Sequence, residues 1–238
     1  MLKGKTITVI IPAYNEAPRI SQVLSIVSNN SFLDRVIVVD DGSQDETSKV
    51  AANFPVEIIR LPQNRGKGWA LVEGIRRAED SDIYLFIDAD LIYLREEHLL
   101  ALLKPIVYRA SVDMTVGIFR GGRKLSDLAQ KFFPFLNGQR AVRGEWVRNL
   151  PDFSWTRFGV EVFLTCFAQK TASQVESIPL WGISHFHKEE KYGPFLGFYH
   201  RLKMYFEVAR AYLWLEKKSK IVSKVVEKES DGYAQMQS

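Results

Sequence analysis

Four short apolar runs, each followed by polar turn residues, determine the fold class of the first half of the chain. The runs cover residues 6–11, 35–39, 56–61 and 83–87 and are rich in valine, isoleucine and leucine. Strands that are covered on both faces have this composition, which is typical of a parallel sheet. Segments of helical length separate the runs, so the order of elements predicts right-handed β-α-β units and an α/β fold with a mostly parallel central sheet flanked by helices.

Helical periodicity marks the segments between the runs. In residues 18–29, for example, Ile20, Val23 and Val27 fall on one face of a helix. One later helix is expected to end before Pro105, because proline lacks an N–H and clashes with the preceding turn. Further helices are expected over residues 45–52, 69–78, 96–103, 126–133, 158–169 and 197–218, and further strands over residues 113–119 and 174–180.

Length and composition predict one large domain. The chain has 238 residues, of which 46% are hydrophobic, and this is enough for the core of one α/β domain. We expect the domain to span residues 1–218 and a flexible polar tail to span residues 219–238. The net charge is +4 and the basic residues are spread along the chain. No nucleic-acid partner is therefore predicted, whereas a small anionic ligand or an anionic membrane surface fits this charge.

Sequence features that would indicate secretion or membrane insertion are not found. The first apolar run stops at Pro12 and has no small-residue cleavage site, so it predicts a strand and not a signal peptide. No segment offers the run of about 18 apolar residues that a transmembrane helix needs. The single cysteine, Cys166, lies among apolar residues and predicts a buried, inert thiol. These observations predict a cytoplasmic protein.

Two carboxylates one residue apart follow the last of the four runs. Asp88 and Asp90 leave its carboxyl end, where ligands of open α/β sheets bind, and residues two apart on an extended chain point to the same side. Two close anions repel each other unless one is protonated or a cation lies between them. A hard divalent ion such as Mg²⁺ or Mn²⁺, whose usual companions are substrate phosphates, meets this need. The alternative interpretation is a pair of solvated turn residues.

Four motifs occur in order, each after a predicted strand: IPAYNEA, VVDDGSQDET, NRGKGWA and FIDADL. In this combination the chain resembles the family-2 glycosyltransferases with the GT-A fold. The resemblance implies transfer of a sugar from a nucleotide-sugar donor, with Asp88 and Asp90 binding a divalent ion that bridges the diphosphate. It also implies a nucleotide-sugar-binding half (1–91), an acceptor and metal half (92–195) and a C-terminal amphipathic helix (196–218).

The resemblance assigns residues to the nucleotide-sugar site. Asp41 is expected to accept a hydrogen bond from the edge of uracil, because an ionised carboxylate suits an imide N–H, whereas Asp40 has the competing role of a turn former or cap. Lys67, in a glycine-flanked loop, is expected to reach the donor phosphates, and a solvated lysine is the alternative. The implied nucleotide-sugar-binding residues are Pro12, Ala13, Tyr14, Asn15, Glu16, Asp41, Gly66, Lys67, Asp88 and Ala89.

The second half carries GQRA, FGVE and SHFHKEEKYG, which look like the arrangement in glucosyl-3-phosphoglycerate synthases and related bacterial members. The resemblance places Glu161 on a helix that faces the metal and makes His185 a metal ligand, with His187 as the alternative ligand. A histidine with a structural role only is the competing interpretation. The region that would hold a phosphoglycerate is not recognisable, so the acceptor stays open. The implied acceptor-binding residues are Gly138, Gln139 and Arg140, and contact of Gln139 and Arg140 with donor hydroxyls is the alternative.

Glu161 has two functional interpretations. In an inverting enzyme it would deprotonate the acceptor hydroxyl, and in a retaining enzyme it would lie below the sugar and position the donor or stabilise positive charge. A buried glutamate that only pairs with Arg140 or Arg143 is the structural alternative. The implied catalytic residues are Glu161, Asp90 and Arg140.

The sequence therefore predicts a metal-dependent glycosyltransferase that passes a hexose, with glucose as first choice, from a UDP-sugar to an unidentified hydroxyl or phosphate acceptor. The basic and aromatic helix at 197–218 supports a rival, a polyprenyl-phosphate or lipid glycosyltransferase in peripheral contact with the inner face of the membrane. The same aromatic stripe also fits core packing or a homodimer seam. A nucleotidyltransferase is disfavoured because its glycine-rich phosphate loop would follow the first strand, where this chain has the residues PAYNE (12–16) instead. A non-catalytic nucleotide-sugar-binding protein is the non-enzymatic alternative.

Overall fold

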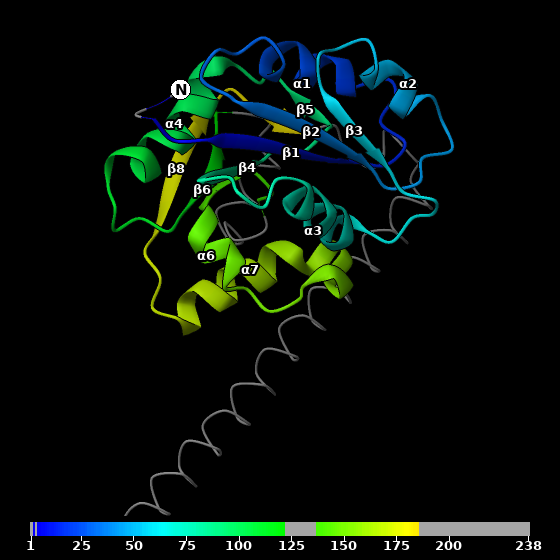
Figure 1. The fold of residues 1–238 in the computed structure, drawn as a ribbon. Helices are drawn as coiled ribbons and strands as arrows, with labels where there is room; N and C mark the ends of the chain where they lie inside the picture. Colours follow the sequence, from blue (N-terminus) through cyan, green and yellow to red (C-terminus); the bar gives the residue numbers. More distant parts are fainter. Residues whose placement is uncertain (1, 3, 122–136, 186–238) are drawn as a thin grey trace, which may run out of the picture.

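The computed structural model describes residues 2, 4–121 and 137–185. The segments 126–133, 197–218 and 219–238 and the alternative metal ligand His187 lie outside these residues. In the described part a seven-stranded sheet forms the centre, with the strand order β3-β2-β1-β4-β7-β6-β8, and a second, two-stranded sheet pairs β5 with β9 (Figure 1).

The elements follow the predicted alternation of strands and helices in the first half of the chain. The strands are β1 Ile7–Ala13, β2 Arg35–Asp40, β3 Glu57–Arg60, β4 Ile83–Phe86, β5 Leu91–Ile92, β6 Met114–Arg120, β7 Arg140–Arg143, β8 Val175–Trp181 and β9 Ser184–His185. The helices are α1 Ile20–Val27, α2 Thr47–Ala51, α3 Lys67–Arg77, α4 Glu96–Tyr108, α6 Gly144–Arg148 and α7 Val160–Lys170, with a 3-10 helix, η2, at Ser154–Gly159. Among the helices described here, none combines the length and the apolar character that crossing a bilayer requires.

The large sheet is mostly parallel, as predicted. Strand β1 runs parallel to β2 and β4, β2 runs parallel to β3, and β6 runs parallel to β8. Only β7 is reversed, because it pairs in antiparallel register with both β4 and β6. The carboxyl ends of the six other strands therefore lie along one edge of the sheet, which we call the carboxyl edge.

Both faces of the sheet are covered by helices (Figure 1). Ile7, Val9 and Ile11 of β1 pack in the same cluster as buried residues of α1 and α4, whereas Ile10 packs with buried residues of α3 and α7 on the other face. Helix α3 lies close to β1, since a Cβ atom at Gly74 would come within 2.5 Å of Ile10 Cγ2. Burial on both faces explains why the strands are continuous apolar runs without a polar face.

Helix α4 continues through Pro105 to Tyr108, so the prediction that it ends before the proline was wrong. The missing proline N–H costs one hydrogen bond, but continuation of the helix buries Ile106, which is 1% exposed. The Leu102 carbonyl, one turn before Ile106, also accepts a hydrogen bond from the Thr115 hydroxyl of β6 at 2.8 Å. Tertiary packing therefore outweighs the local preference against proline.

A buried neutral histidine organises the first turn of α4. The Arg95 N–H donates to His98 Nδ1 at 3.1 Å, and His98 Nε2 lies 3.0 Å from the Trp181 carbonyl oxygen at the end of β8. Because Nδ1 accepts a hydrogen bond, Nε2 carries the proton and donates to the carbonyl. Burial lowers the pKa of His98 below its ordinary value of 6.5.

Acidification is expected to weaken the protein through His98. Below about pH 6.5 the unfolded chain binds a proton at this residue more readily than the folded protein does. The free energy of unfolding therefore falls with pH, by up to about 1.4 kcal/mol per pH unit from this group. A His98→Gln variant, whose amide keeps one donor and one acceptor, should show a flatter dependence in thermal unfolding between about pH 7.5 and pH 5. Equal slopes in the two proteins would contradict this role.

Candidate active site

The loops that follow β1 and β2 are joined to each other at the carboxyl edge. Asn15 has a left-handed φ of 54°. Its N–H donates a hydrogen bond to Ser43 Oγ at 3.0 Å, and its Oδ1 accepts one from the Gln44 N–H at 2.9 Å. The Glu16 N–H donates to Thr47 Oγ1 at 2.8 Å. Two of the predicted nucleotide-site residues, Asn15 and Glu16, are therefore joined to residues 43–47, and we call this pair of loops the double loop.

Asp40 and Asp41, adjacent in sequence, have different roles. Asp40 is fully buried and its Oδ1 accepts from the Ser43 N–H at 2.8 Å, so it forms the turn. Asp41 accepts from the N–H groups of Arg65 and Gly66, at 2.8 and 2.7 Å. Burial raises the pKa of Asp41 above its ordinary value, although the two N–H groups act in the opposite direction. Asp41 thus fixes the loop that leads into α3, a role that its sequence motif did not indicate, and its contact with uracil stays a prediction.

The prediction that Lys67 lies in a loop was wrong, because Lys67 is the first residue of α3. The preceding Gly66 has a φ of 98°, a conformation that favours glycine. Its fixed N–H allows the helix to begin at Lys67, two residues before the expected start at Trp69. The free N–H groups and the dipole of a helix N-terminus favour anions, so Lys67 adds its charge to an end that already suits a phosphate.

Lys67, Asp88 and Glu161 form a cluster of charged side chains, which we call the central triad. They come from α3, the turn after β4 and the first turn of α7. Lys67 Nζ contacts Asp88 Oδ1 and lies 2.6 Å from Glu161 Oε1, and the three side chains are only 14%, 17% and 10% exposed. Burial alone would lower the pKa of Lys67, but the two carboxylates outweigh it and raise this pKa well above the ordinary 10.5. Lys67 is therefore a cation at any physiological pH.

The segment before β7 forms one wall of the central triad. The register of β7 against β4 places Arg140 opposite Phe86, two residues before Asp88. Gln139 Nε2 donates to Asp88 Oδ2 at 2.9 Å. A Cβ atom at Gly138 would lie 2.5 Å from both Asp88 Oδ2 and Lys67 Nζ, so a side chain there would push the ends of these two side chains away. The predicted residues Gly138 and Gln139 are thus brought to the D-A-D motif.

Arg140 lies behind this wall and is 1% exposed. Its guanidinium donates to the Asn137 carbonyl oxygen and to Thr165 Oγ1, both at 3.0 Å. Burial lowers the pKa of Arg140 to about 10, and the charges of Glu161 and Asp88 limit this fall. Arg140 is therefore a buried cation that supports the two carboxylates from within the protein, and its contact with an acceptor stays a prediction.

The structural alternative for Glu161, an ion pair with Arg140 or Arg143, is not what the geometry shows. The ion pair of Glu161 is with Lys67. Arg143 instead donates to main-chain carbonyls that include Ile106 and Val112, at and just beyond the end of α4. Such contacts satisfy carbonyls that have no partner within the helix, which is why Arg143 is unavailable to Glu161.

The D-A-D motif lies in a turn. Strand β4 ends at Phe86, and Ala89 and Asp90 form a turn that leads into β5. The expectation that an extended strand sets the directions of Asp88 and Asp90 was therefore wrong, because the turn sets them. Asp88 belongs to the central triad, and Asp90 is partly exposed.

The donor atoms at this turn suit a hard divalent ion. Carboxylate oxygens of Asp88 and Asp90 are the ligands that Mg²⁺ and Mn²⁺ prefer, and such ions are often held by one or two carboxylates together with substrate phosphates. Within the described residues, no three His, Cys, Asp or Glu side chains are grouped as a metal site. Strand β9 places the backbone of His185 opposite Leu91, the residue after Asp90. The predicted third ligand is thus near the turn in the fold, although far from it in sequence.

Arg157 is a residue that sequence inspection missed. Its guanidinium donates to the Arg65 carbonyl oxygen at 3.3 Å and to Asn64 Oδ1 at 3.0 Å, so it holds from the other side the loop that Asp41 fixes. Its φ of 51° and ψ of −117° are unusual for a residue with a side chain. Nothing in the sequence around Arg157 signals this role, because the contact joins segments about ninety residues apart.

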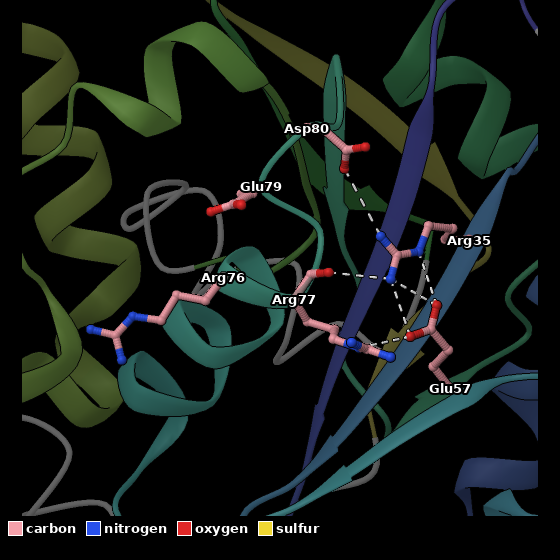
Figure 2. Close-up of a pocket in the computed structure, with 6 residues that line it drawn as sticks. All are labelled: Arg35, Glu57, Arg76, Arg77, Glu79 and Asp80. Atoms are coloured by element: carbon pink, nitrogen blue, oxygen red, sulfur yellow. Dashed lines mark hydrogen bonds and ion pairs between the residues drawn. The ribbon is translucent and has the colours of Figure 1, made fainter.

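A concave region lies at the edge of the sheet opposite the carboxyl edge. This hollow has a volume of about 600 Å³. Figure 2 shows its lining residues, with Arg35 and Glu57 facing each other at the starts of β2 and β3. Arg35 Nε and Arg77 Nε lie 2.9 and 3.0 Å from Glu57 oxygens. These charges satisfy one another, and surface pairs of this kind contribute about 0–1 kcal/mol each. The hollow is lined by Arg35, Glu57, Arg76, Arg77, Glu79 and Asp80.

Solved structures share this architecture. Glucosyl-3-phosphoglycerate synthase from Mycobacterium tuberculosis, in complex with Mn²⁺, UDP and glucosyl-3-phosphoglycerate, has a TM-score of 0.72 and 26% identity, over 90% of this chain and 80% of that chain. The same enzyme in complex with Mn²⁺ and UDP-glucose has a TM-score of 0.65 and 27% identity, over 77% of this chain and 72% of that chain. These similarities confirm the predicted GT-A fold.

Relatives known from sequence match shorter parts of the chain. Dolichyl-phosphate beta-glucosyltransferase of Homo sapiens is 39% identical over 102 residues, which are 36% of this chain and 31% of that protein. A 4,4'-diaponeurosporenoate glycosyltransferase of Staphylococcus aureus is 35% identical over 98 residues, 39% of this chain and 26% of that protein. The match thus spans less than a third of the length of these curated relatives.

The family comparison covers most of the site. The model described as "Glycosyl transferase family 2" matches residues 8–163, well over half of the chain. The matched region includes the double loop, the D-A-D turn and the whole central triad. The chain therefore belongs to glycosyl transferase family 2.

Proposed function

We propose that this protein transfers a hexose, with glucose as first choice, from a UDP-sugar to a hydroxyl or phosphate acceptor, with Mg²⁺ or Mn²⁺ as cofactor. The central triad is the observation that carries this proposal, because it joins a cation and two carboxylates at the carboxyl edge, beside the D-A-D turn. The solved relative binds Mn²⁺, UDP and UDP-glucose, and this supports the choice of donor.

The residues present fit a divalent ion. Asp88 and Asp90 would hold it, with His185 as the third ligand, and the ion when bound would act as a Lewis acid toward the leaving diphosphate. Asp88 is now in contact with Lys67 Nζ through Oδ1 and with Gln139 Nε2 through Oδ2. Lys67 thus neutralises the carboxylate, and its side chain would turn toward the phosphates if Asp88 held the ion.

The protein's own groups then divide the chemistry between them. Lys67 and the N-terminus of α3 bind and neutralise the diphosphate, whose negative charge grows as the bond to the sugar breaks. Glu161, released from Lys67, takes the proton from the acceptor hydroxyl or supports the sugar from below. Arg140 remains behind the site and limits the electrostatic cost of holding Asp88 and Glu161 so close together.

A lipid-linked acceptor is the second candidate. The human relative is named for dolichyl phosphate and the staphylococcal one for diaponeurosporenoate, and both are long hydrophobic molecules. If this chain shares such an acceptor, the aromatic and basic sequence at 197–218 would contact the membrane surface. Product analysis with a polyprenyl phosphate and with 3-phosphoglycerate as competing acceptors separates the two candidates.

Calorimetric titration of UDP with Mn²⁺ tests the donor site directly. Wild-type protein should bind UDP only weakly without metal, and Asp90→Asn should lose most of the gain that Mn²⁺ gives, by about 10- to 100-fold in Kd. Asp80→Asn is a matched control, because Asp80 is an exposed carboxylate (88%) at the opposite edge of the sheet. Binding of UDP that is the same with and without Mn²⁺, or equal in Asp90→Asn and wild type, would overturn the proposed metal site.

A further inference from the structure

Two buried polar atoms beside the central triad have no hydrogen-bond partner in the part of the chain that the structure describes. They are Asn137 Nδ2 and Gln139 Oε1, and the two residues are 4% and 0% exposed. Buried polar side chains in native proteins are nearly always paired, and each exception calls for an explanation. An unpaired donor and an unpaired acceptor, two residues apart at the wall of the site, indicate a ligand that supplies both partners.

The contacts of the two side-chain amides determine which of their atoms have no hydrogen-bond partner among the described residues. Gln139 lies against Asp88, and an ionised carboxylate only accepts, so the amide must turn its NH₂ group to Asp88 and its oxygen elsewhere. Asn137 Oδ1 accepts the Gln139 N–H at 3.2 Å, so its NH₂ group is the unpaired end. The unpaired groups are therefore fixed by chemistry and do not depend on an arbitrary choice between amide nitrogen and oxygen.

The position of the segment connects these atoms to the donor. Gly138, between the two amides, approaches Lys67 and Asp88 so closely that a Cβ atom would lie 2.5 Å from each. In the proposed function these two side chains face the diphosphate, directly or through the ion. The anomeric carbon of the hexose is bonded directly to an oxygen of that diphosphate. The hexose therefore lies next to residues 137–139.

The chemistry of the two atoms excludes a phosphate and fits a hydroxyl. Phosphate oxygens are acceptors, so they cannot satisfy Gln139 Oε1, whereas a sugar hydroxyl both donates and accepts. We infer that Asn137 Nδ2 and Gln139 Oε1 bind ring hydroxyls of the transferred hexose and so select the sugar. This inference rests on the proposed function, and it makes Asn137 a specificity residue that no motif indicated.

Binding measurements with UDP and UDP-glucose test the inference without turnover. Asn137→Ser keeps an oxygen that can accept the Gln139 N–H but removes the NH₂ donor. In the presence of Mn²⁺ it should bind UDP like wild type and bind UDP-glucose about 10- to 100-fold more weakly. Gln139→Met, which removes the acceptor together with the Nε2 donor to Asp88, should also raise the ratio of the Kd for UDP-glucose to that for UDP, because the change at Asp88 acts on both ligands. Asn53→Ser, at an exposed asparagine outside the site, is the matched control and should leave this ratio unchanged.

Deoxyglucose donors identify the hydroxyl. With wild type, one of the 2-, 3-, 4- and 6-deoxy forms of UDP-glucose should bind markedly more weakly, and Asn137→Ser should show no further loss with that same analogue. Additive losses at every position, or an unchanged ratio of the two Kd values in both variants, would overturn the inference and leave water as the partner of these atoms. A wild-type protein that binds no UDP would instead contradict the proposed function itself, so the two failures are distinguishable. Thermal unfolding of each variant confirms that it is folded.

Discussion

Replacing Lys67 by methionine is expected to lower the unfolding temperature of the metal-free protein by about 6–12 °C. The substitution removes the cation that lies between two largely buried carboxylates, and such a loss costs about 3 kcal/mol. In a chain of this size each kcal/mol shifts the unfolding temperature by about 2–4 °C. Methionine keeps the length of the side chain, so the loss reports charge more than packing. Differential scanning calorimetry in the presence of a chelator measures it.

Manganese should reverse this effect more strongly in Lys67→Met than in wild type. In the wild-type protein the ion must displace the ammonium from Asp88, whereas in the variant the two carboxylates are uncompensated and attract it. A ligand that binds only the folded protein stabilises it by RT ln(1 + [L]/Kd), so the rise in unfolding temperature with Mn²⁺ compares the two affinities. UDP binding should nevertheless weaken in the variant, because the lysine also neutralises the negative charge of the phosphates.

A lysine in an exposed pair provides the control for this experiment. Lys49 lies 2.8 Å from Glu46, but its side chain is 83% exposed. Lys49→Met should leave both the unfolding temperature and the response to Mn²⁺ unchanged. If Lys67→Met in chelator is as stable as wild type, the central triad does not carry the charge balance described above.

The sequence predicted the strands and the sheet edge that hold the site, because these features depend on local sequence patterns. Apolar runs that end in polar residues predicted four parallel strands and the edge where their loops meet, and the D-A-D motif marked one point on that edge. The contacts between the loops could not be predicted in the same way. Asp41 holds the loop that precedes Lys67, and Arg157 holds the same loop from a segment about ninety residues later. Such contacts depend on the three-dimensional arrangement and leave no periodic trace.

The elements whose bounds were predicted wrongly also show that local patterns are not sufficient. Lys67 was expected in a loop because two glycines flank it, yet Gly66 adopts a φ of 98° and lets α3 begin there. Helix α4 was expected to stop at Pro105, yet burial of its last turn outweighs the cost of the proline. No motif marks Asn137, because an asparagine in a loop is common, and its importance follows only from its buried Nδ2 atom, which has no partner among the described residues. In each case tertiary context decides between local alternatives of similar free energy.

Glu161→Gln is expected to lower kcat by about 10²- to 10⁴-fold if the carboxylate takes the proton of the acceptor. The amide has the same shape but cannot accept a proton at neutral pH, and it can still contact Lys67 through its oxygen. Binding of UDP with Mn²⁺ should therefore change little, and kcat, measured with saturating donor and acceptor, should carry the loss. Glu97→Gln is a matched control, since Glu97 also lies in the first turn of a helix but is 66% exposed.

The pattern of losses separates the two roles of Glu161. A general base is needed after the donor has bound, so its loss lowers kcat and leaves the Kd of UDP-glucose near the wild-type value. A group that supports the sugar from below is needed for donor binding and ionisation, so its loss weakens UDP-glucose relative to UDP and slows donor hydrolysis without acceptor. The anomeric configuration of the product, measured by NMR, must agree: inversion accompanies the first pattern and retention the second. A variant that keeps more than about half of the wild-type kcat would remove Glu161 from the chemistry altogether, because even a modest contribution from acid-base catalysis exceeds that range.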